Sequence, residues 1–197
     1  MALPGVYDIF NERWCKQTIW IISDTHFSDE ELRAGYPNRP SDEDLVRLIN
    51  SKVGRKDTLL LLGDVGDLEY AKQLRGYKVL LMGNHYTGAT KYEEIFDEVY
   101  EGPVMISEKL LLSHEPVEIP WAFNIHGHIH DPKHENDKHH FNVCSDTIGY
   151  VPINLNQWIK KGYLSHIESI HRVTINKAIE RKKKRNRNFF NSHGQKR

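Results

Sequence analysis

The sequence predicts an α/β protein in which two sheets pack face to face with helices outside them. In the first half, short apolar runs alternate with helical patterns, which is typical of strands joined by helices into a parallel sheet. In residues 104–144 short strands follow one another more closely, and a late helix is expected near residues 155–161. Neither half has enough helix to cover one wide sheet on both faces, so two packed sheets are expected.

Apolar runs of four to six residues, each bounded by turn residues, predict the buried strands. They are residues 18–22, 58–62, 78–82, 110–113, 123–126 and 141–144. Between the early runs, residues 41–52 have the pattern of a helix, because Leu45, Val46, Leu48 and Ile49 share one face. Ser41 is placed to cap the first turn of this helix.

Length and composition predict one soluble domain. The chain has 197 residues, of which 39% are apolar and 27% charged, and no apolar run approaches the ~20 residues that span a bilayer. The first 14 residues mix Asp8, Glu12 and Arg13 with apolar residues, so no secretory leader is expected. Cys15 and Cys144 lie far apart and are interpreted as free thiols of a cytoplasmic protein.

The net charge of zero conceals a strong asymmetry between the two ends of the chain. Residues 177–197 contain nine Lys or Arg and the single acid Glu180, whereas residues 1–176 carry 18 bases and 26 acids. We therefore divide the chain into a domain of residues 1–176 and a basic, flexible C-terminal tail of residues 177–197. Two interpretations of the tail remain open, a solvated helix end that frays or a segment that attracts nucleic acid.

Residues with metal-binding or acid–base side chains follow five of the predicted strands. In an open parallel sheet, ligands gather beyond the carboxyl ends of the strands, so these positions matter most. The five segments are Asp24-Thr25-His26, Gly63-Asp64-Val65-Gly66-Asp67, Gly83-Asn84-His85, His114, and Gly127-His128-Ile129-His130. Each alone is as readily explained by chance or by an ordinary turn, but their order and their common position after strands indicate one metal site.

With these five segments, the chain resembles the calcineurin-like metallophosphoesterase family. The family's ordered motifs are Asp-x-His, Gly-Asp-x-x-Asp, Gly-Asn-His, an isolated His and Gly-His-x-His, and all five occur between Asp24 and His130. The resemblance covers most of the chain, since the expected strand framework continues to about residue 160. It implies a four-layer α/β/β/α sandwich, and no cap domain is evident in so short a chain.

The resemblance also implies a ligand set for two divalent ions. It assigns Asp24, His26 and His130 to one ion, Asn84, His114 and His128 to the other, and Asp64 to a bridge between them. Imidazole and carboxylate ligands without thiolate favour Mn, Fe, Zn, Ni or Co, but they do not choose among these metals. A bridging carboxylate suits ions ~3.5–4 Å apart, which grip one phosphoryl group and supply hydroxide near neutral pH.

The family pattern assigns the general acid to His85, the His of Gly-Asn-His. Asp67 resembles the carboxylate that orients this histidine, and such a partner would raise the imidazole pKa and fix its tautomer. Asp67 also precedes a helix expected from Leu68, so an N-capping role is the alternative. Two departures from the pattern are Tyr86, where many relatives have an acid, and the lack of an Arg after Asp67, which argues against close kinship with the Ser/Thr protein phosphatases.

The remaining polar residues near the motifs match no ligand position. His126, His134, His139 and His140 are interpreted as surface or supporting residues, with His126 the best placed of them to touch substrate. Asn142 and Asp146 lie at and just beyond the last predicted strand and receive no role. Residues 30–40 form the longest irregular stretch near the site and are a candidate for a substrate-facing lid, although an ordinary surface loop is the equal alternative.

Together these patterns predict a two-metal phosphoesterase that hydrolyses a phosphodiester or phosphomonoester by hydroxide attack. Its substrate would be a phosphate ester such as a nucleotide. Two alternatives remain: a catalytically weak metal-binding scaffold of the same fold, which the presence of His85 disfavours, and a nuclease guided by the basic tail. No membrane association is expected.

Overall fold

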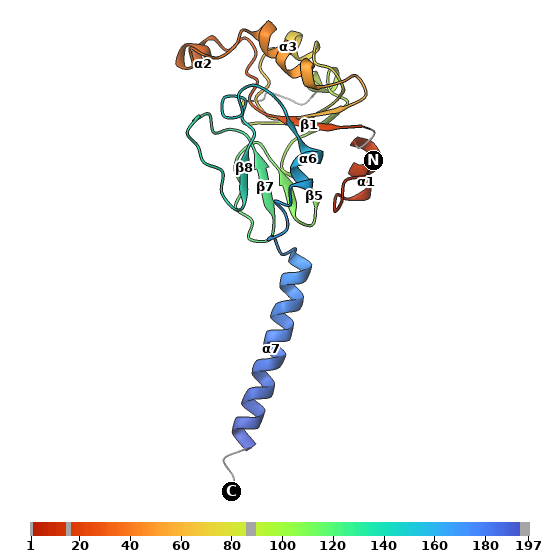
Figure 1. Cartoon of the computed structure of the whole chain (residues 1–197), viewed down its shortest axis with the longest axis vertical. Helices are drawn as coiled ribbons and strands as arrows, with labels where there is room; N and C mark the ends of the chain where they lie inside the picture. The colour runs from red at the N-terminus through yellow and green to blue at the C-terminus, as the bar shows by residue number, and fades with distance from the viewer. Residues whose placement is uncertain (1, 15–16, 86–89, 194–197) are drawn as a thin grey trace.

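Two sheets form the body of the molecule (Figure 1). The computed structural model describes residues 2–14, 17–85 and 90–193, with side chains in the last range described as far as residue 184. One sheet has the strand order β4-β3-β2-β1-β9 and the other β5-β6-β7-β8. The strands are β1 Ile19–Ile22, β2 Thr58–Leu62, β3 Tyr77–Leu81, β4 Glu98–Tyr100, β5 Val104–Ser107, β6 Leu110–Leu112, β7 Phe123–His126, β8 His140–Asn142 and β9 Ile153–Asn154.

Seven helices accompany these strands in the described part of the chain. They are α1 Asp8–Trp14, α2 Glu30–Gly35, α3 Asp42–Lys52, α4 Leu68–Ala71, α5 Thr90–Glu93, α6 Leu155–Lys160 and α7 Ile170–His193. Helix α3 begins where the sequence predicts, because the Ser41 side chain accepts a hydrogen bond from the Asp44 backbone N–H at 3.1 Å. Three acids in its first turn are favourable near the positive end of the helix dipole.

The central strand β2 shows why the first sheet is buried on both faces. Its five residues are all buried, and successive side chains point to opposite faces. Leu59 and Leu61 pack with Leu45 and Ile49 of α3 in an outer core, whereas Leu60 belongs to the core between the sheets. Strands β1 to β4 pair in parallel, and the short β9 adds an antiparallel edge.

The second sheet faces the first across the inner core. Phe123 and Ile125 of β7 point into this core, and Trp158 of α6 packs edge-on against the Phe123 ring at a centroid distance of 5.0 Å. Asn124 points to the outer face, where its side chain accepts a hydrogen bond from the Val117 backbone N–H at 2.8 Å. The loop between β6 and β7 therefore covers part of this outer face.

Backbone hydrogen bonds join the two sheets beside the predicted site. Ser23, directly after β1, forms a parallel bridge with Cys144, two residues after the end of β8. The Ser23 N–H donates to the Val143 carbonyl at 3.0 Å, and the Ser145 N–H donates to the Ser23 carbonyl at 2.9 Å. This junction fixes the strand ends of both sheets against each other.

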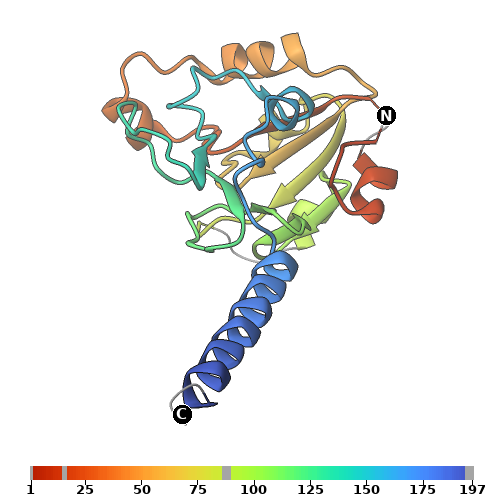
Figure 2. The ribbon, with the colours of Figure 1, turned by 60° about the horizontal axis from the view of Figure 1, so that its bottom comes forward.

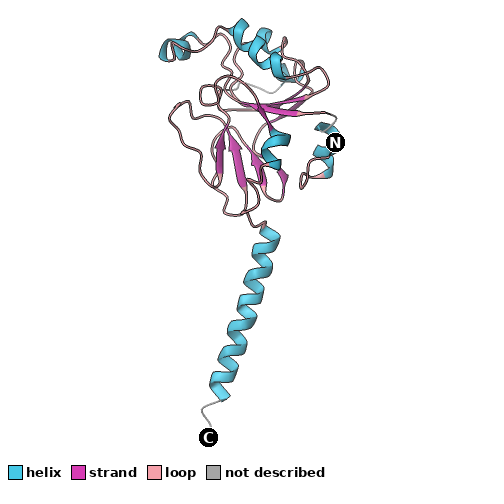
Figure 3. Ribbon diagram, viewed as in Figure 1, coloured by secondary structure: helices cyan, strands magenta, loops and turns pink. Residues whose placement is uncertain are grey.

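The α/β/β/α sandwich of two packed sheets is confirmed (Figure 3). The expected strands agree with β1, β2, β3, β6, β7 and β8 to within two residues. Strand β5 begins at residue 104, where the region of closely spaced strands was expected. The sequence did not indicate β4 and β9, because they are only two or three residues long and only partly buried.

Helix α7 continues through residue 177, so no break in secondary structure marks the expected boundary between domain and tail. The division into residues 1–176 and 177–197 stays a prediction based on charge. No helix among the described residues is both long enough and apolar enough to cross a bilayer.

Candidate metal centre

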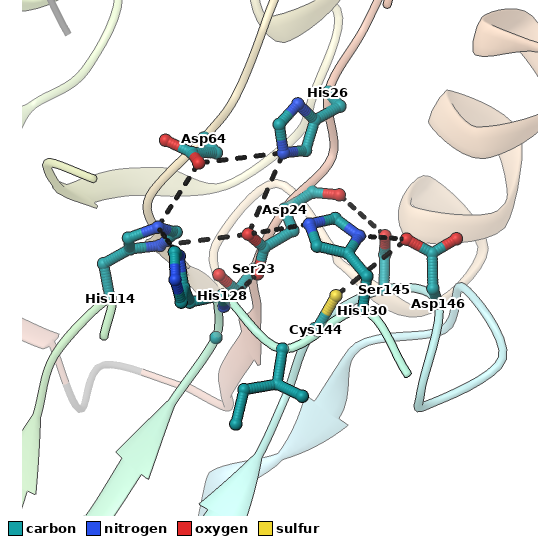
Figure 4. A network of polar contacts seen from close by, with 12 residues as sticks. Ser23, Asp24, His26, Asp64, His114, His128, His130, Cys144, Ser145 and Asp146 are labelled. Carbon is teal, nitrogen blue, oxygen red and sulfur yellow. Dashed lines mark hydrogen bonds and ion pairs between the residues drawn. The ribbon is translucent and has the colours of Figure 1, made fainter. Parts of the chain in front are cut away.

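The ends of five strands meet at one edge of the sandwich and bring the predicted ligands together (Figure 4). Each ligand lies within four residues of the carboxyl end of its strand. Asp24 and His26 follow β1, Asp64 follows β2, Asn84 follows β3, His114 follows β6, and His128 and His130 follow β7. The site therefore draws on both sheets and depends on their packing.

Three of these side chains converge on the Nε2 atom of a fourth, His114. Asn84 Oδ1 lies 3.0 Å from it, His128 Nδ1 3.2 Å and Asp64 Oδ2 3.3 Å. Atoms bound to one ion at ~2.0–2.2 Å lie roughly 3–3.5 Å from one another, so this spacing suits a shared ion. The Leu62 carbonyl, 2.9 Å from His114 Nδ1, can accept the proton on that nitrogen and leave Nε2 free as a ligand.

A second group converges on Asp24 Oδ1. His130 Nε2 lies 3.5 Å from this oxygen and His26 Nε2 lies 3.9 Å from it. Asp64 Oδ2 is 3.7 Å from His26 Nε2, so one carboxylate oxygen of Asp64 borders both groups. This is the position that a bridging ligand requires.

Two buried atoms in the second group have no hydrogen-bond partner, and they test whether the residues fit a metal. They are Asp24 Oδ1 and His26 Nε2. A buried carboxylate oxygen without a partner costs folding free energy, and buried polar groups are normally satisfied. A divalent ion between Asp24, His26 and Asp64 would satisfy both atoms, so the donor set fits a metal ion.

The backbone at the ligands is held in a conformation that L-residues rarely adopt. Asp24, His26, Asp64 and His128 have φ angles of 57°, 41°, 37° and 68°. Such left-handed residues cost about 1–3 kcal/mol each and persist only where the surroundings hold them. Four of the seven predicted ligands therefore carry strain that aims their side chains at one point.

Two glycines of the motifs leave room for the carboxylates. A Cβ atom at Gly83 would lie 2.3 Å from Asp64 Oδ1, and one at Gly127 would lie 2.4 Å from Asp24 Oδ2. Both are far below van der Waals contact, so glycine is required by close approach at these positions.

Comparison with known proteins decides the family. The model of the calcineurin-like phosphoesterase family matches residues 17–196, which include every residue of the site. The chain belongs to the calcineurin-like phosphoesterase family. Metal-dependent hydrolysis of phosphate esters is the general activity of this family.

Two solved structures resemble this phosphoesterase. A protein of unknown function from Aquifex aeolicus, AQ665, is 26% identical, with a TM-score of 0.60 over 73% of this chain and 98% of that one. YfcE, a phosphoesterase from E. coli, is 15% identical, with a TM-score of 0.39 over 70% of this chain and 82% of that one. No curated protein matches the sequence.

The phosphoesterase site contains a buried network that the sequence did not indicate. Asp146 accepts hydrogen bonds from His130 Nδ1 at 2.7 Å, from Arg39 Nη1 at 2.6 Å and from the Tyr150 hydroxyl at 2.9 Å. The Arg39 side chain is 2% exposed and also donates to the carbonyls of Asp24 and Thr25. Asp146 follows a strand as the ligand acids do, and that position was the available signal.

The charges around His130 change its affinity for protons. Burial lowers the pKa of His130, but the hydrogen bond to Asp146 and the nearby Asp24 carboxylate outweigh burial and raise this pKa to about 12. A proton and a metal ion compete for Nε2, so metal binding here must release a proton. Burial raises the pKa of the nearby Cys144 thiol to about 11, which keeps the thiol neutral near pH 7. Cys15 lies outside the described residues.

The two residues with predicted catalytic roles, His85 and Asp67, have different interaction partners. His85 is exposed over 69% of its side chain, and its Nε2 lies 3.9 Å from Asp64 Oδ2. Asp67 caps α4 through the Glu69 N–H at 2.9 Å and accepts the Ser28 hydroxyl at 3.1 Å. The N-capping alternative for Asp67 is therefore confirmed. No hydrogen bond or ion pair joins Asp67 to His85 within the described residues, and its orienting role stays a prediction.

A cleft of about 460 Å³ opens beside the ligands. Its wall includes Leu32, Gly35 and Tyr36, which belong to α2 or follow it directly. The candidate lid of residues 30–40 is thus partly helical and borders the site. The Asp29 side chain caps α2 through the Leu32 N–H and also contacts His26 Nδ1 at 3.0 Å.

The expectation that His126 is the best placed of the other histidines to touch substrate is wrong. His126 is 1% exposed, and its ring packs against those of His134 and His140. Strand β7 alternates its side chains, so His126 lies on the same face as Asn124, where His134 and His140 cover it. Burial lowers the pKa of His126 to about 4. The departure at Tyr86 lies outside the described residues.

Asp146→Asn tests the supporting network. The amide keeps the shape but removes the charge that makes the His130 imidazole a better ligand, so we expect metal affinity or activity to fall about 10–100-fold. Metal titration followed by hydrolysis assays would measure both, with circular dichroism to verify folding. Asp137→Asn is the matched control, because Asp137 pairs with His140 at 3.0 Å in an exposed place. Equal effects of the two substitutions would contradict the assignment.

Proposed function

We propose that this chain hydrolyses a phosphomonoester or phosphodiester with two divalent ions. The main support is that Asp64 Oδ2 borders both groups of ligands, 3.3 Å from His114 Nε2 and 3.7 Å from His26 Nε2, next to two buried atoms that lack partners. One ion would be held by Asp24, His26 and His130, and the other by Asn84, His114 and His128. Asp64 would bridge them.

The bound ions would polarise the phosphoryl group and activate water for in-line attack. The protein's own part is to hold the ligands in fixed positions before substrate arrives. Asp64 is suited to this, because the hydrogen bond and charge of His114 outweigh burial and lower the Asp64 pKa. An ionised carboxylate at this point could offer its lone pairs to the ions that both groups of ligands would hold.

We assign the general acid to His85. Its exposed ring lines the cleft beside Asp64, where a leaving oxygen needs a proton. Asp67 is proposed to support this histidine from the neighbouring loop. A cytoplasmic location and manganese as one suitable metal are further parts of the proposal.

The cleft supports a substrate with a flat or apolar leaving group. Leu32 and Tyr36 give its wall an apolar and aromatic part, and no Lys or Arg occurs among its described lining residues. An ester with further phosphates beyond the reacting one would find no cation on this wall, whereas Lys91 lines an adjoining pocket with Asp64 and His85. Nucleoside monophosphates and simple diesters suit this wall better than polyphosphates.

Asp64→Asn and His85→Asn separate metal binding from proton transfer. Asp64→Asn removes charge from the bridge, so we expect loss of metal occupancy and of activity together. His85→Asn leaves the ligands in place, so we expect metal retention and a rate loss of about 10²–10⁴-fold. Metal analysis and initial rates on an alkyl phosphate would distinguish them. Full activity of His85→Asn on such a poor leaving group would refute the general-acid assignment.

Tyr36→Ala tests the wall of the cleft. Loss of an aromatic contact of about 0.5–1.5 kcal/mol should raise KM for p-nitrophenyl esters roughly 2–10-fold. The KM for glycerol phosphate should change little, because that ester has no ring to contact. Tyr7→Ala is the control, since Tyr7 is 43% exposed and lines a different groove. If the two variants have the same KM for p-nitrophenyl esters, the wall has no role in binding.

A further inference from the structure

Helix α7 extends from the body without packing against it. It comprises 24 residues, Ile170–His193, and so is about 36 Å long. Its side chains from residue 170 to residue 184 are exposed or half-buried. Figures 1 and 2 show it leaving the molecule at the end away from α2, which borders the cleft. No burial of apolar surface explains why this segment is helical.

The charge of α7 points to an anionic partner. Lys177, Arg181 and Lys184 lie within one stripe at spacings of four and three residues, where like charges repel and destabilise an isolated helix. Within the described residues, none of these three side chains forms an ion pair, either with Glu180 of the same helix or with an acid of the body. A polyanion would remove this repulsion.

The distribution of side chains around α7 favours a nucleic-acid groove over a membrane surface as the anionic partner. At 100° per residue, Lys182 and Lys183 point to other sides of the helix than the stripe of Lys177, Arg181 and Lys184. The apolar residues are likewise divided, with Ile175 and Ile179 on the side opposite that stripe and Ile170 and Val173 on the same side as the stripe. A helix that lies on a membrane needs one apolar face and one cationic face. A helix in a groove has phosphates on both flanks.

We propose that α7 docks into the major groove of duplex DNA. That groove is ~12 Å wide and admits an α-helix, with phosphate rows on either side for the surrounding cations. The body carries 18 bases and 26 acids in residues 1–176 and would be repelled by DNA. Because α7 is several times longer than the ~8 Å Debye length, its distal part binds beyond the reach of this repulsion. The inference goes beyond hydrolysis and does not depend on it.

The test compares DNA binding with and without the stripe of charge. The variant combines Lys177→Gln, Arg181→Gln and Lys184→Gln, since glutamine has nearly the helix propensity of lysine. Anisotropy of a labelled 20-base-pair duplex, measured from 50 to 200 mM salt, gives the slope of log K against log salt. Each lost phosphate contact reduces that slope by about 1, so the triple variant should reduce it by about 3.

The matched control removes three cations from the body through Lys52→Gln, Arg55→Gln and Lys56→Gln, all exposed. It should bind DNA with an unchanged slope, and both variants should hydrolyse p-nitrophenyl phosphate as the parent chain does. Phosphatidylserine vesicles and single-stranded oligonucleotides serve as competitors. Equal slopes for the two variants, competition by vesicles at least as strong as by duplex, or preference for single strands would each overturn the proposal.

Discussion

The position of one carboxylate, that of Asp64, determines most of the site. Its Oδ2 atom lies between two groups of ligands, 3.3 Å from His114 Nε2 and 3.7 Å from His26 Nε2. The left-handed backbone at Asp64 aims the side chain there, and Gly83 leaves the space that it occupies. The strain is sustained because strands of both sheets are fixed against each other at the adjacent Ser23 junction.

Beside this centre, the positive charge of Arg39 compensates the buried negative charge of Asp146. Arg39 pairs with Asp146 and donates hydrogen bonds to the carbonyls of Asp24 and Thr25. These hydrogen bonds stabilise the strained loop after β1. Breaking such a buried pair leaves an uncompensated charge, which costs more than the pair itself contributes. The loop that carries Arg39 thus serves both the cleft wall and the metal ligands.

Sequence reasoning could predict the two-sheet fold because long apolar runs such as 58–62 dictate buried strands whatever their surroundings. It could also name candidate ligands, because metal-binding side chains recur directly after strands. It could not pair Arg39 with Asp146, since these two residues are 107 positions apart and only tertiary packing joins them. His126 was misjudged because the side chains that cover its face of β7, those of His134 and His140, reach it only in the folded chain.

Metal content measured together with turnover tests the central claim most directly. The purified chain would be analysed for bound metals and assayed on bis-p-nitrophenyl phosphate and p-nitrophenyl phosphate, with manganese and with chelator. We expect two metal equivalents per chain and hydrolysis of at least one ester that chelator abolishes and manganese restores. Failure to bind metal, or hydrolysis that chelator leaves unchanged, would contradict it.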